Sequence, residues 1–253
     1  MEHGFTPKHD EEGWKILQPD HETGEPHLVD VSIFAITQAK RFDCIEVVKG
    51  DDGYIAVLKK PAEEAIEGEH PTLSDNLSQL SSKPRLTALA RTGLMDSPPE
   101  EDFDRLTKLA STVLKCPISL TTLVTADRQF FKSQHGLSGE YAEKRGSPLA
   151  DSICKFVAAN GKELIVTDAC KHLLVKDMPM VGKLNLQAYA GYPLWSSDKQ
   201  ALGAFSVIDH KPRYWSKAEL LLLMEIAGMA NLCIEAAEMR IKLAEAHLER
   251  QKV

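Results

Sequence analysis

Two stretches, each with two apolar segments around a polar turn, constrain the fold of this 253-residue chain more than any other feature. Residues 118–125 are apolar and β-branched, residues 126–128 form a polar turn, and residues 129–133 run back. The stretch "YAGYPLWSSDKQALGAFSVID", at 189–209, repeats the order of strand, turn and strand. This is the pattern of antiparallel hairpins. Since helical patterns lie before, between and after them, the sequence predicts an α+β domain with a central antiparallel sheet flanked by helices.

Three stretches around the hairpins have the marks of helices. In residues 85–114, Gly93 ends one helix, and a Ser-Pro-Pro sequence followed by acidic residues begins another. The run "DSICKFVAANGK" predicts a short helix with Asp151 or Ser152 as its N-cap. One long helix is predicted from about Ser216 onward.

The N-terminal third divides into three parts by composition. Residues 1–25 are rich in His, Glu and Asp and are expected to be an acidic, disordered arm. Residues 26–60 begin with helical spacing and continue with two strand-like runs around "GDDG", which predicts a small α+β unit. Residues 61–84 are expected to be a linker. The main domain then covers residues 85–239, and residues 240–253 extend its last helix.

Charge and composition argue against several classes of function. Residues 1–82 hold 17 acidic and 7 basic residues, a net charge of −10, and the remaining 20 acidic and 23 basic residues give +3. An acidic arm does not suit a nucleic-acid partner. No glycine-rich phosphate loop joins a strand to a helix, and the polar N-terminus lacks the apolar centre of a signal peptide. The longest strongly apolar run, 220–224, is far short of a membrane span, so we expect a cytoplasmic protein.

Five ordered segments between Arg85 and Met239 resemble the GAF domain family. They are "RLTALARTGLMDSPPEEDFDRLTKLAS", "PISLTTLVTADRQFFKSQHGL", "SICKFVAANGKELIVTDA", "YAGYPL" and "ALGAFSVIDHKPRYWSKAELLLLMEIA". The resemblance implies a GAF-like fold of the type at the N-terminus of bacterial sensor histidine kinases and diguanylate cyclases. It also implies a non-enzymatic sensory function in which the domain binds a small molecule. It leaves the cofactor unknown, because GAF domains bind cyclic nucleotides, bilins, haem, small metabolites or nothing.

The resemblance further implies where a ligand would bind, between one face of the sheet and the segments that cross over it. The implied ligand-binding residues are Phe131, Asp151, Ser152, Cys154, Asp168, Tyr189 and Gly191. Neither a catalytic residue nor a metal site is expected. Residues 173–187 hold no Cys, whereas bilin-binding relatives carry their attachment residue there. The cysteines also lack the surroundings of the three-cysteine set that methionine sulfoxide-reducing relatives use.

A thiol-based redox sensor is an alternative interpretation. Cys154 lies near the start of a predicted helix, where the helix dipole lowers a thiol pKa. Cys170 lies in a predicted loop next to Lys171 and His172. Against this, a cysteine at the position of Cys154 is commonly a buried small apolar residue. A single Cys-Lys-His sequence is also a poor zinc site.

The Asp209-His210 pair at the end of the second hairpin suggests catalysis at first sight. Neighbouring side chains on a strand point to opposite faces, so the two do not form an acid–base pair. We expect a structural role, in which Asp209 accepts hydrogen bonds from the turn that follows and Ser216 caps the next helix.

The long C-terminal helix carries a heptad pattern. One position is held by Leu220, Ala227, Ile234, Ile241 and Leu248, and the other by Leu223, Ala230, Ala237 and Ala244. Nine apolar residues out of nine predict a parallel coiled coil, and hence a homodimer through the Leu220–Leu248 helix. The alternative is a helix that packs only on its own domain. We expect the dimer helix to relay the ligand state to a signalling output protein, and the alternative function is an interaction or dimerisation module without a ligand.

Overall fold

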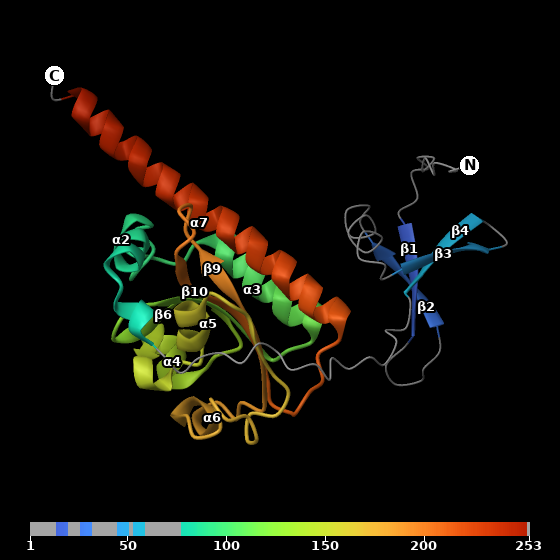
Figure 1. Ribbon diagram of the computed structural model, residues 1–253. Helices are drawn as coiled ribbons and strands as arrows, with labels where there is room; N and C mark the ends of the chain where they lie inside the picture. The colour runs from blue at the N-terminus through green and yellow to red at the C-terminus, as the bar shows by residue number, and fades with distance from the viewer. Residues whose placement is uncertain (1–13, 20–25, 32–44, 51–52, 59–76, 252–253) are drawn as a thin grey trace. The chain divides into compact units, whose positions relative to one another are not determined.

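The computed structural model describes residues 14–19, 26–31, 45–50, 53–58 and 77–251 (Figure 1). The chain divides into two compact units, Met1–Glu64 and Ala65–Val253.

The first unit contains a four-stranded sheet in the order β2-β1-β4-β3. Its strands are β1 (Trp14–Pro19), β2 (Pro26–Val31), β3 (Ile45–Gly50) and β4 (Gly53–Leu58). The hairpin predicted around "GDDG" is confirmed, since β3 and β4 pair antiparallel from Ile45–Leu58 to Gly50–Gly53. The central pair, β1 and β4, is parallel.

Two predictions for this unit are wrong. Strand β1 lies inside the segment 1–25, which composition indicated to be disordered, and it pairs antiparallel with β2 along all six residues. Residues 26–31 form that strand and not the start of a helix. The apolar residues of "PHLVDV" fit a period of two as well as a period of 3.6 over so short a stretch, and the pairing with β1 decides between them. The remaining residues of the expected helix lie outside the described residues.

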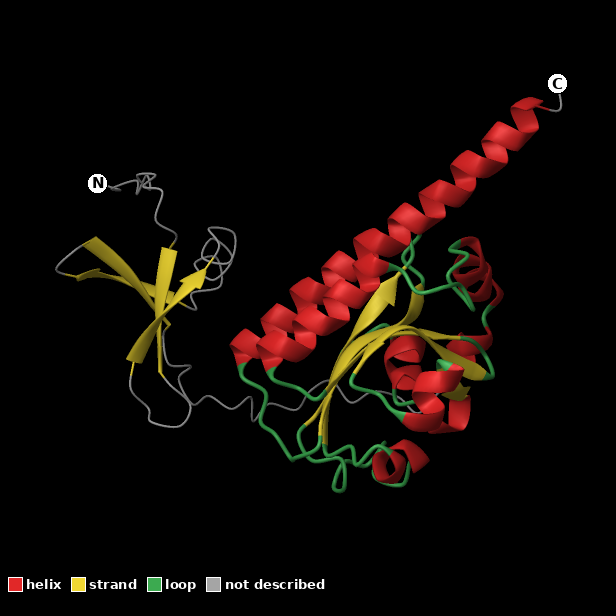
Figure 2. Cartoon of the chain, turned by 180° about the vertical axis from the view of Figure 1, so that it is seen from behind, coloured by secondary structure: helices red, strands yellow, loops and turns green. Residues whose placement is uncertain are grey.

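The second unit is built on a six-stranded sheet in which all neighbouring strands are antiparallel (Figure 2). Its order is β7 (Gly146–Pro148), β6 (Arg128–His135), β5 (Ile118–Val124), β10 (Ala201–Asp209), β9 (Ala188–Trp195) and β8 (Leu164–Val166). Both predicted hairpins are confirmed, as β5–β6 and β9–β10. The two hairpins meet where β5 pairs with β10 at the centre of the sheet.

Helices cover both faces of this sheet. One face is covered by α3 (Glu101–Leu114) and α7 (Lys217–Gln251), which lie side by side in Figures 1 and 2, and α2 (Lys83–Arg91) packs into the same core. The opposite face is covered by shorter elements. They are α4 (Gly139–Lys144), α5 (Cys154–Asn160), α6 (Pro179–Lys183), η1 (Ser78–Ser81) and η2 (Leu149–Asp151).

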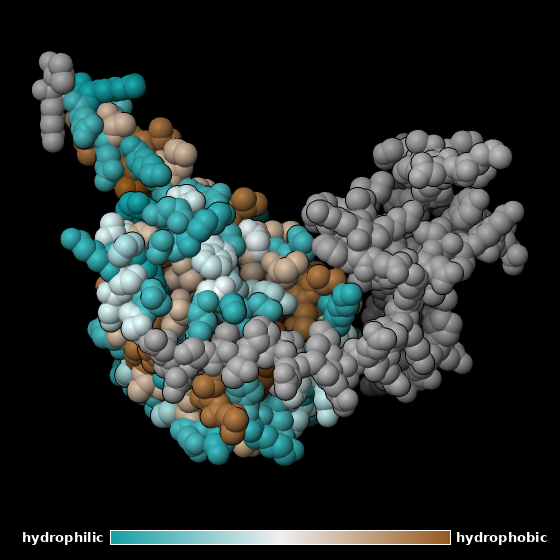
Figure 3. All heavy atoms as spheres, viewed as in Figure 1, coloured by the Kyte–Doolittle hydropathy of each residue, from teal (hydrophilic) through white to brown (hydrophobic). Residues whose placement is uncertain are grey.

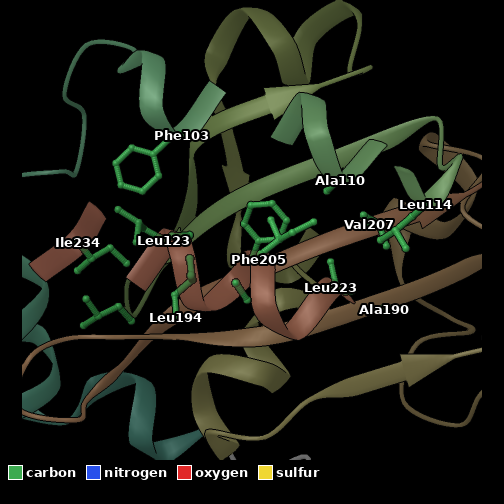
Figure 4. Close-up of a cluster of buried hydrophobic side chains, with 14 of the residues drawn as sticks. Phe103, Ala110, Leu114, Leu123, Ala190, Leu194, Phe205, Val207, Leu223 and Ile234 are labelled. Atoms are coloured by element: carbon green, nitrogen blue, oxygen red, sulfur yellow. The ribbon is translucent and has the colours of Figure 1, made fainter. Parts of the chain in front are cut away.

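The core under α3 and α7 contains a continuous cluster of apolar side chains (Figure 4). Leu123, Phe205 and Val207 project from the sheet into it. They meet side chains of the two covering helices, namely Phe103, Ala110, Leu114, Leu223 and Ile234. Since each of these side chains is at most 2% exposed, this face holds the helices by hydrophobic burial.

The start of the domain was predicted too late. Element η1 lies within the segment 61–84 that was expected to be a linker, and its Leu80 is buried in the core beneath α5. The serines around Leu80 indicated a linker, so the sequence did not reveal that this leucine is buried.

The turn and cap predicted after the second hairpin are confirmed. Asp209 accepts hydrogen bonds from the amide of Lys211 (3.2 Å) and from the guanidinium of Arg213 (3.1 Å). The Ser216 hydroxyl accepts from the Glu219 amide (3.2 Å), and the Glu219 carboxylate accepts from the Ser216 amide (2.8 Å). This reciprocal pair is a capping box that starts α7.

The heptad positions of α7 are largely occupied by its own domain. Six of the nine residues are buried in the core, namely Leu220, Leu223, Ala227, Ala230, Ile234 and Ala237. Ile241 packs against Gly93, whose added Cβ would lie 2.6 Å from the Ile241 Cδ1 atom. The predicted dimer seam is therefore wrong over most of its length, because a helix lying on a sheet needs the same apolar period as a coiled coil.

Helix α7 is also apolar enough, by length and composition, to cross a membrane, which the length of its apolar runs did not reveal. Only 39% of its most apolar window is buried within the domain. The buried part is the side that packs on the sheet, so this helix is weak evidence for a membrane span.

Candidate functional site

The face of the sheet opposite α7 brings together most of the residues predicted to bind a ligand. Phe131, Cys154 and Tyr189 lie in one buried cluster with α5 and α6, and they are 0%, 3% and 1% exposed. Phe130, the neighbour of Phe131, points to the other face and joins the α3–α7 core. The alternation of side chains along β6 thus separates a site residue from a core residue.

Tyr189 fills the middle of this face. Its ring lies over Gly191 on the same strand, and a Cβ on Gly191 would be only 2.2 Å from the Tyr189 hydroxyl. Any larger residue at position 191 would force the tyrosine to move. Gly191 therefore makes the space that Tyr189 occupies.

Four polar side chains gather around the Tyr189 hydroxyl, and we call Thr122, Cys154, Tyr189 and Ser206 the polar cluster. The Cys154 Sγ lies 3.4 Å from the Tyr189 hydroxyl and 3.9 Å from the Ser206 Oγ. Thr122 lies beside the same thiol, but its Oγ1 makes no well-formed hydrogen bond within residues 77–251. All four residues are at most 3% exposed. Buried polar atoms without full hydrogen bonding are costly, so a group of four such side chains calls for an explanation.

The polar cluster is uncharged near neutral pH. Burial raises the pKa of the Cys154 thiol, and burial together with the neighbouring Cys154 raises the pKa of Tyr189 well above its usual value. A buried protonated thiol is a poor nucleophile. The cluster can therefore donate and accept hydrogen bonds, but its environment does not activate Cys154 for chemistry.

Asp151 bonds two side chains at the edge of this face. Its Oδ2 accepts hydrogen bonds from the Tyr141 hydroxyl (2.9 Å) and from the Lys183 ammonium (2.9 Å). The Lys183 hydrogen bond is the main cause that lowers the pKa of Asp151. Since Lys183 ends α6, this ion pair ties α6 to η2 across the site.

The segment 168–187, which we call the covering segment, lies over the same face. Its Val175, Met180, Val181 and Leu186 are buried against the cluster that contains Tyr189. These apolar contacts, with the Asp151–Lys183 pair, cover the polar cluster in this structure. Access for a small molecule would require the covering segment to move.

Two of the predicted site residues serve local structure. The Ser152 hydroxyl donates to the Gln129 side chain (2.6 Å) and accepts from the Lys155 amide (3.2 Å), so it caps the first turn of α5. The Asp168 carboxylate accepts from the Cys170 amide (3.1 Å) and pairs with Lys171 (2.8 Å) within its own loop. Asp168 is not brought together with the polar cluster.

Sequence reasoning missed four residues of this region: Thr122, Ser206, Tyr141 and Lys183. Thr122 and Ser206 each interrupt an apolar strand at a position that alternates with core residues, as between Leu120 and Val124. This alternation could have identified both residues, because burying a polar side chain on a strand costs free energy and so points to a specific role. Tyr141 and Lys183 gave no such signal, since both lie on short helices far apart in the sequence.

Strand β9 connects the two faces of the sheet. Tyr189 and Gly191 face the polar cluster, and Ala190 between them is buried in the core under α7. Helix α7 packs directly on β9. Tyr189 on one face is therefore one residue away from Ala190, which lies on the face that α7 covers.

Comparison with known families identifies the domain. The GAF domain family model matches residues 98–234, more than half of the chain, so the chain belongs to the GAF domain family. GAF domains are typically regulatory sensory modules. The domain with its six-stranded antiparallel sheet, flanking helices and long C-terminal helix is thus a GAF domain.

The individual relatives described here are at most 30% identical to this chain. A cyclic di-GMP phosphodiesterase from Pseudomonas aeruginosa is 30% identical over 122 residues, 48% of this chain and 20% of that protein. The chain thus spans about a fifth of the length of this curated relative. The blue-light absorbing form of the Thermosynechococcus elongatus PixJ GAF domain is 18% identical, with a TM-score of 0.48 over 67% of this chain and 97% of that one. The GAF domain of an Acinetobacter phosphoenolpyruvate-protein phosphotransferase is 16% identical, with a TM-score of 0.46 over 64% and 96%.

Proposed function

We propose that this chain is a cytoplasmic, non-enzymatic sensory protein. Its GAF domain binds a small molecule at the polar cluster and relays the bound state through α7. The polar cluster is the observation that carries this proposal. Four neutral polar side chains lie together beside a cluster of buried apolar side chains, and the Thr122 hydroxyl has no well-formed hydrogen bond within residues 77–251. Small-molecule sites combine apolar walls with a few convergent polar groups in this way.

The chemistry of the site favours a small, uncharged ligand. The walls contributed by Phe131, Ile208 and Val181 are apolar, and the cluster offers hydroxyl and thiol groups without a fixed charge. A charged ligand group would be desolvated there without a partner, which is costly. The ligand is therefore expected to present one or two hydrogen-bonding groups on an apolar body.

Binding would require the side chains that now fill the site to move. Tyr189 would leave its place over Gly191, and the covering segment would move away from η2. The Asp151–Lys183 pair opposes this movement only modestly, because the Lys183 side chain is 57% exposed and its charge is screened by water. A ligand shifts the domain only if it binds the open arrangement more tightly than the closed one.

The relay would use strand β9. Displacement of Tyr189 moves β9, whose Ala190 packs beneath α7. Helix α7 runs on beyond the domain, since every residue from Lys242 to Gln251 is exposed (Figure 1). The output is a signalling protein or domain in contact with this helix, and an enzyme of cyclic di-GMP turnover is the first to test, given the name of the Pseudomonas relative.

Two neighbouring threonines allow a matched test. Thr122 and Thr121 are both fully buried, and both have an Oγ1 without a partner in the described part of the chain. Along β5 they point to opposite faces, Thr122 with Leu120 and Val124 toward the polar cluster, and Thr121 with Leu123 toward α3. Thr122→Val and Thr121→Val thus make the same chemical change on the two faces.

The readout is small-molecule mass retained by the freshly purified full chain in native mass spectrometry, compared with denatured protein. We expect a retained mass in the wild type and in Thr121→Val, and a loss of at least half of it in Thr122→Val. Both variants should keep or slightly raise the stability of the free protein, because each removes an unpaired buried hydroxyl. Equal retention by both variants, or no retained mass in any of the three proteins, contradicts the proposal and favours an interaction module without a ligand.

A further inference from the structure

A cavity lies between α2 and α7, on the side of the sheet that α7 covers and away from the polar cluster. Its volume is about 310 Å³, at the lower end of the roughly 300–1,000 Å³ that small-molecule sites occupy. Helix α2 contributes Thr87, Ala90 and Arg91 to its walls, and α7 contributes Ile241 and three charged residues. Figure 3 shows hydrophilic side chains around the place where α7 leaves the domain. We call this space the α2–α7 cavity.

Glu238 of α7 lines this cavity and is almost completely buried, with 2% of its surface exposed. Its Oε2 accepts hydrogen bonds from the Ser197 amide (3.3 Å) and from the Ser197 hydroxyl. Its Oε1 has no hydrogen-bond partner within residues 77–251. An ionised carboxylate accepts several hydrogen bonds, and a buried one that lacks them is costly. Glu238 thus brings a buried acceptor without a donor to a cavity with room for a ligand.

Arg91 lines the same cavity but does not supply the missing donor. Its guanidinium pairs with Asp198 in the turn between β9 and β10 (2.7 Å). The hydrogen bond to Asp198, with a smaller contribution from the charge of Glu238, raises the pKa of Arg91. Ser197, which holds the Glu238 Oε2, belongs to the same turn. The turn therefore fixes one side chain of α2 and one of α7, so the cavity is built by three elements.

The charges around the cavity are balanced. Glu238 and Glu245 are acidic, and Arg91 and Lys242 are basic. Lys242 is exposed and forms no ion pair with any residue from 77 to 251. It follows Glu238 by four residues, and side chains at this spacing are neighbours on a helix, with Cβ atoms about 5–6 Å apart. The cavity thus offers an unbonded carboxylate oxygen and, a short distance along α7, an ammonium group.

We propose that the α2–α7 cavity binds a small zwitterion, an amino acid with a short chain between its charges. Its ammonium group donates to the Glu238 Oε1, and its carboxylate pairs with Lys242. An ammonium supplies both the missing donor and a positive charge, and hydrogen bonds between charged groups are about twice as strong as neutral ones. The methylene chain lies against Ala90 and Ile241. Such a ligand differs from the uncharged one proposed for the polar cluster, and it touches α2 and α7 together.

Three probes with the same number of carbon atoms separate the two charges. 4-Aminobutyrate carries both, butylammonium only the cation and butyrate only the anion. Each is titrated into the nitrogen-15-labelled full chain, and the resonance of the Ser197 amide, which bonds Glu238, reports binding at this place. We expect a Kd of about 1 mM for 4-aminobutyrate, a value about 3- to 10-fold higher for butylammonium, and no effect of butyrate up to about 20 mM. Butyrate binding as tightly as the amines, or no shift with 4-aminobutyrate, overturns the inference.

Two glutamates of α7 give matched variants. Glu238→Gln keeps the shape of the side chain and an acceptor for Ser197 but removes the charge, so it should raise the Kd of 4-aminobutyrate about 10-fold or more. Glu235→Gln makes the same change at an exposed residue that does not line the cavity, and should alter the Kd less than about 2-fold. Far-ultraviolet circular dichroism checks that both variants are folded. Equal effects of the two variants contradict the role of Glu238.

Lys242 tests the other end of the ligand. Lys242→Gln should raise the Kd of 4-aminobutyrate about 2- to 5-fold and leave that of butylammonium unchanged, because only the first probe has a carboxylate. Lys242 is exposed, so this variant does not endanger the fold. A change of equal size for both probes contradicts the pairing with Lys242. The retained-mass experiment concerns the opposite face of the sheet, so the two proposed sites stand or fall separately.

Discussion

The two faces of the GAF sheet are built on different principles. Under α3 and α7 a continuous cluster of apolar side chains lies beside a few buried hydroxyls, such as Thr107 and Thr121, and a 35-residue helix covers it. Under α4, α5 and α6 the covering elements are seven residues or shorter, and the core contains the polar cluster. The edge of that face is held by the Asp151–Lys183 ion pair, in which the Lys183 side chain is more than half exposed. We infer from this difference that one face holds the domain together and that the other is the one that opens.

The largest effect should come from the face under α7. Leu223 is fully buried among sheet residues, so Leu223→Ala should lower the free energy of unfolding by about 2–5 kcal/mol. Urea denaturation of the full chain, followed by circular dichroism, measures this. A loss below about 1 kcal/mol would mean that α7 is loosely attached and would remove the contrast between the faces.

The second prediction concerns the fit between Gly191 and Tyr189. Gly191→Ala places a Cβ 2.2 Å from the Tyr189 hydroxyl, which should cost about 1–3 kcal/mol of stability. In a Tyr189→Leu background the same glycine substitution should cost less than half as much, because the ring that it strikes is gone. A double-mutant cycle in urea gives the coupling. Additive effects would show that Tyr189 does not occupy the space above Gly191.

The third prediction addresses the Asp151–Lys183 ion pair. Asp151→Asn should lower stability near pH 7 by about 1 kcal/mol, because the bond from Lys183 loses its charge. Lys183 lowers the pKa of Asp151, so the stabilisation is fully present above the ordinary aspartate pKa of about 3.9 and disappears as the pH falls through the lower folded value. The unfolding curves of wild type and Asp151→Asn should therefore converge toward pH 2.

Lys183 provides the upper limit of the same pH window. Its hydrogen bond to Asp151 raises the pKa of Lys183, so that contribution is present below the ordinary lysine pKa of about 10.4 and is lost as the pH rises through the higher folded value. A stability difference between wild type and Asp151→Asn that stays constant from pH 7 down to pH 2 would contradict the role given to this pair.

The smallest difference between the two faces is expected in the reactivity of their cysteine thiols. Cys154 and Cys116 are buried, and burial raises the pKa of Cys154 and brings that of Cys116 to about 12, whereas Cys170 is exposed. Iodoacetamide at pH 7.5 should label Cys170 and leave Cys154 and Cys116 unmodified in the native protein. Peptide mapping by mass spectrometry reads the sites. Rapid labelling of Cys154 would revive the redox-sensor interpretation.

Much of the fold could be predicted from the sequence. The two hairpins have apolar runs and polar turns close together in the chain, so local signals suffice. The capping box at Ser216 is equally local. Strand β1 could not be predicted, because its pairing with β2 and β4 outweighs an acidic surrounding composition. The heptad of α7 misled for a physical reason, since burial on a sheet and burial on a second helix impose nearly the same period.

The candidate site was predictable only in part. The resemblance to GAF domains pointed to Phe131, Cys154 and Tyr189, which do share one buried face. Ser206 comes from a strand that is not adjacent to α5 in sequence, and its place beside Cys154 depends on the register of β9 and β10. That register is a tertiary property, which no short pattern of residues records.

Amide hydrogen exchange of the full chain tests most directly whether one face is fixed and the other opens. The account predicts that the covering segment and the start of β9, residues 168–189, exchange through local openings with a free energy well below that of global unfolding. Amides of β10 and of α7 from Leu220 to Ala237 should exchange only on global unfolding. Equal protection of both sets of amides would contradict the account, because the polar cluster would then be sealed in a core that opens only when the domain unfolds.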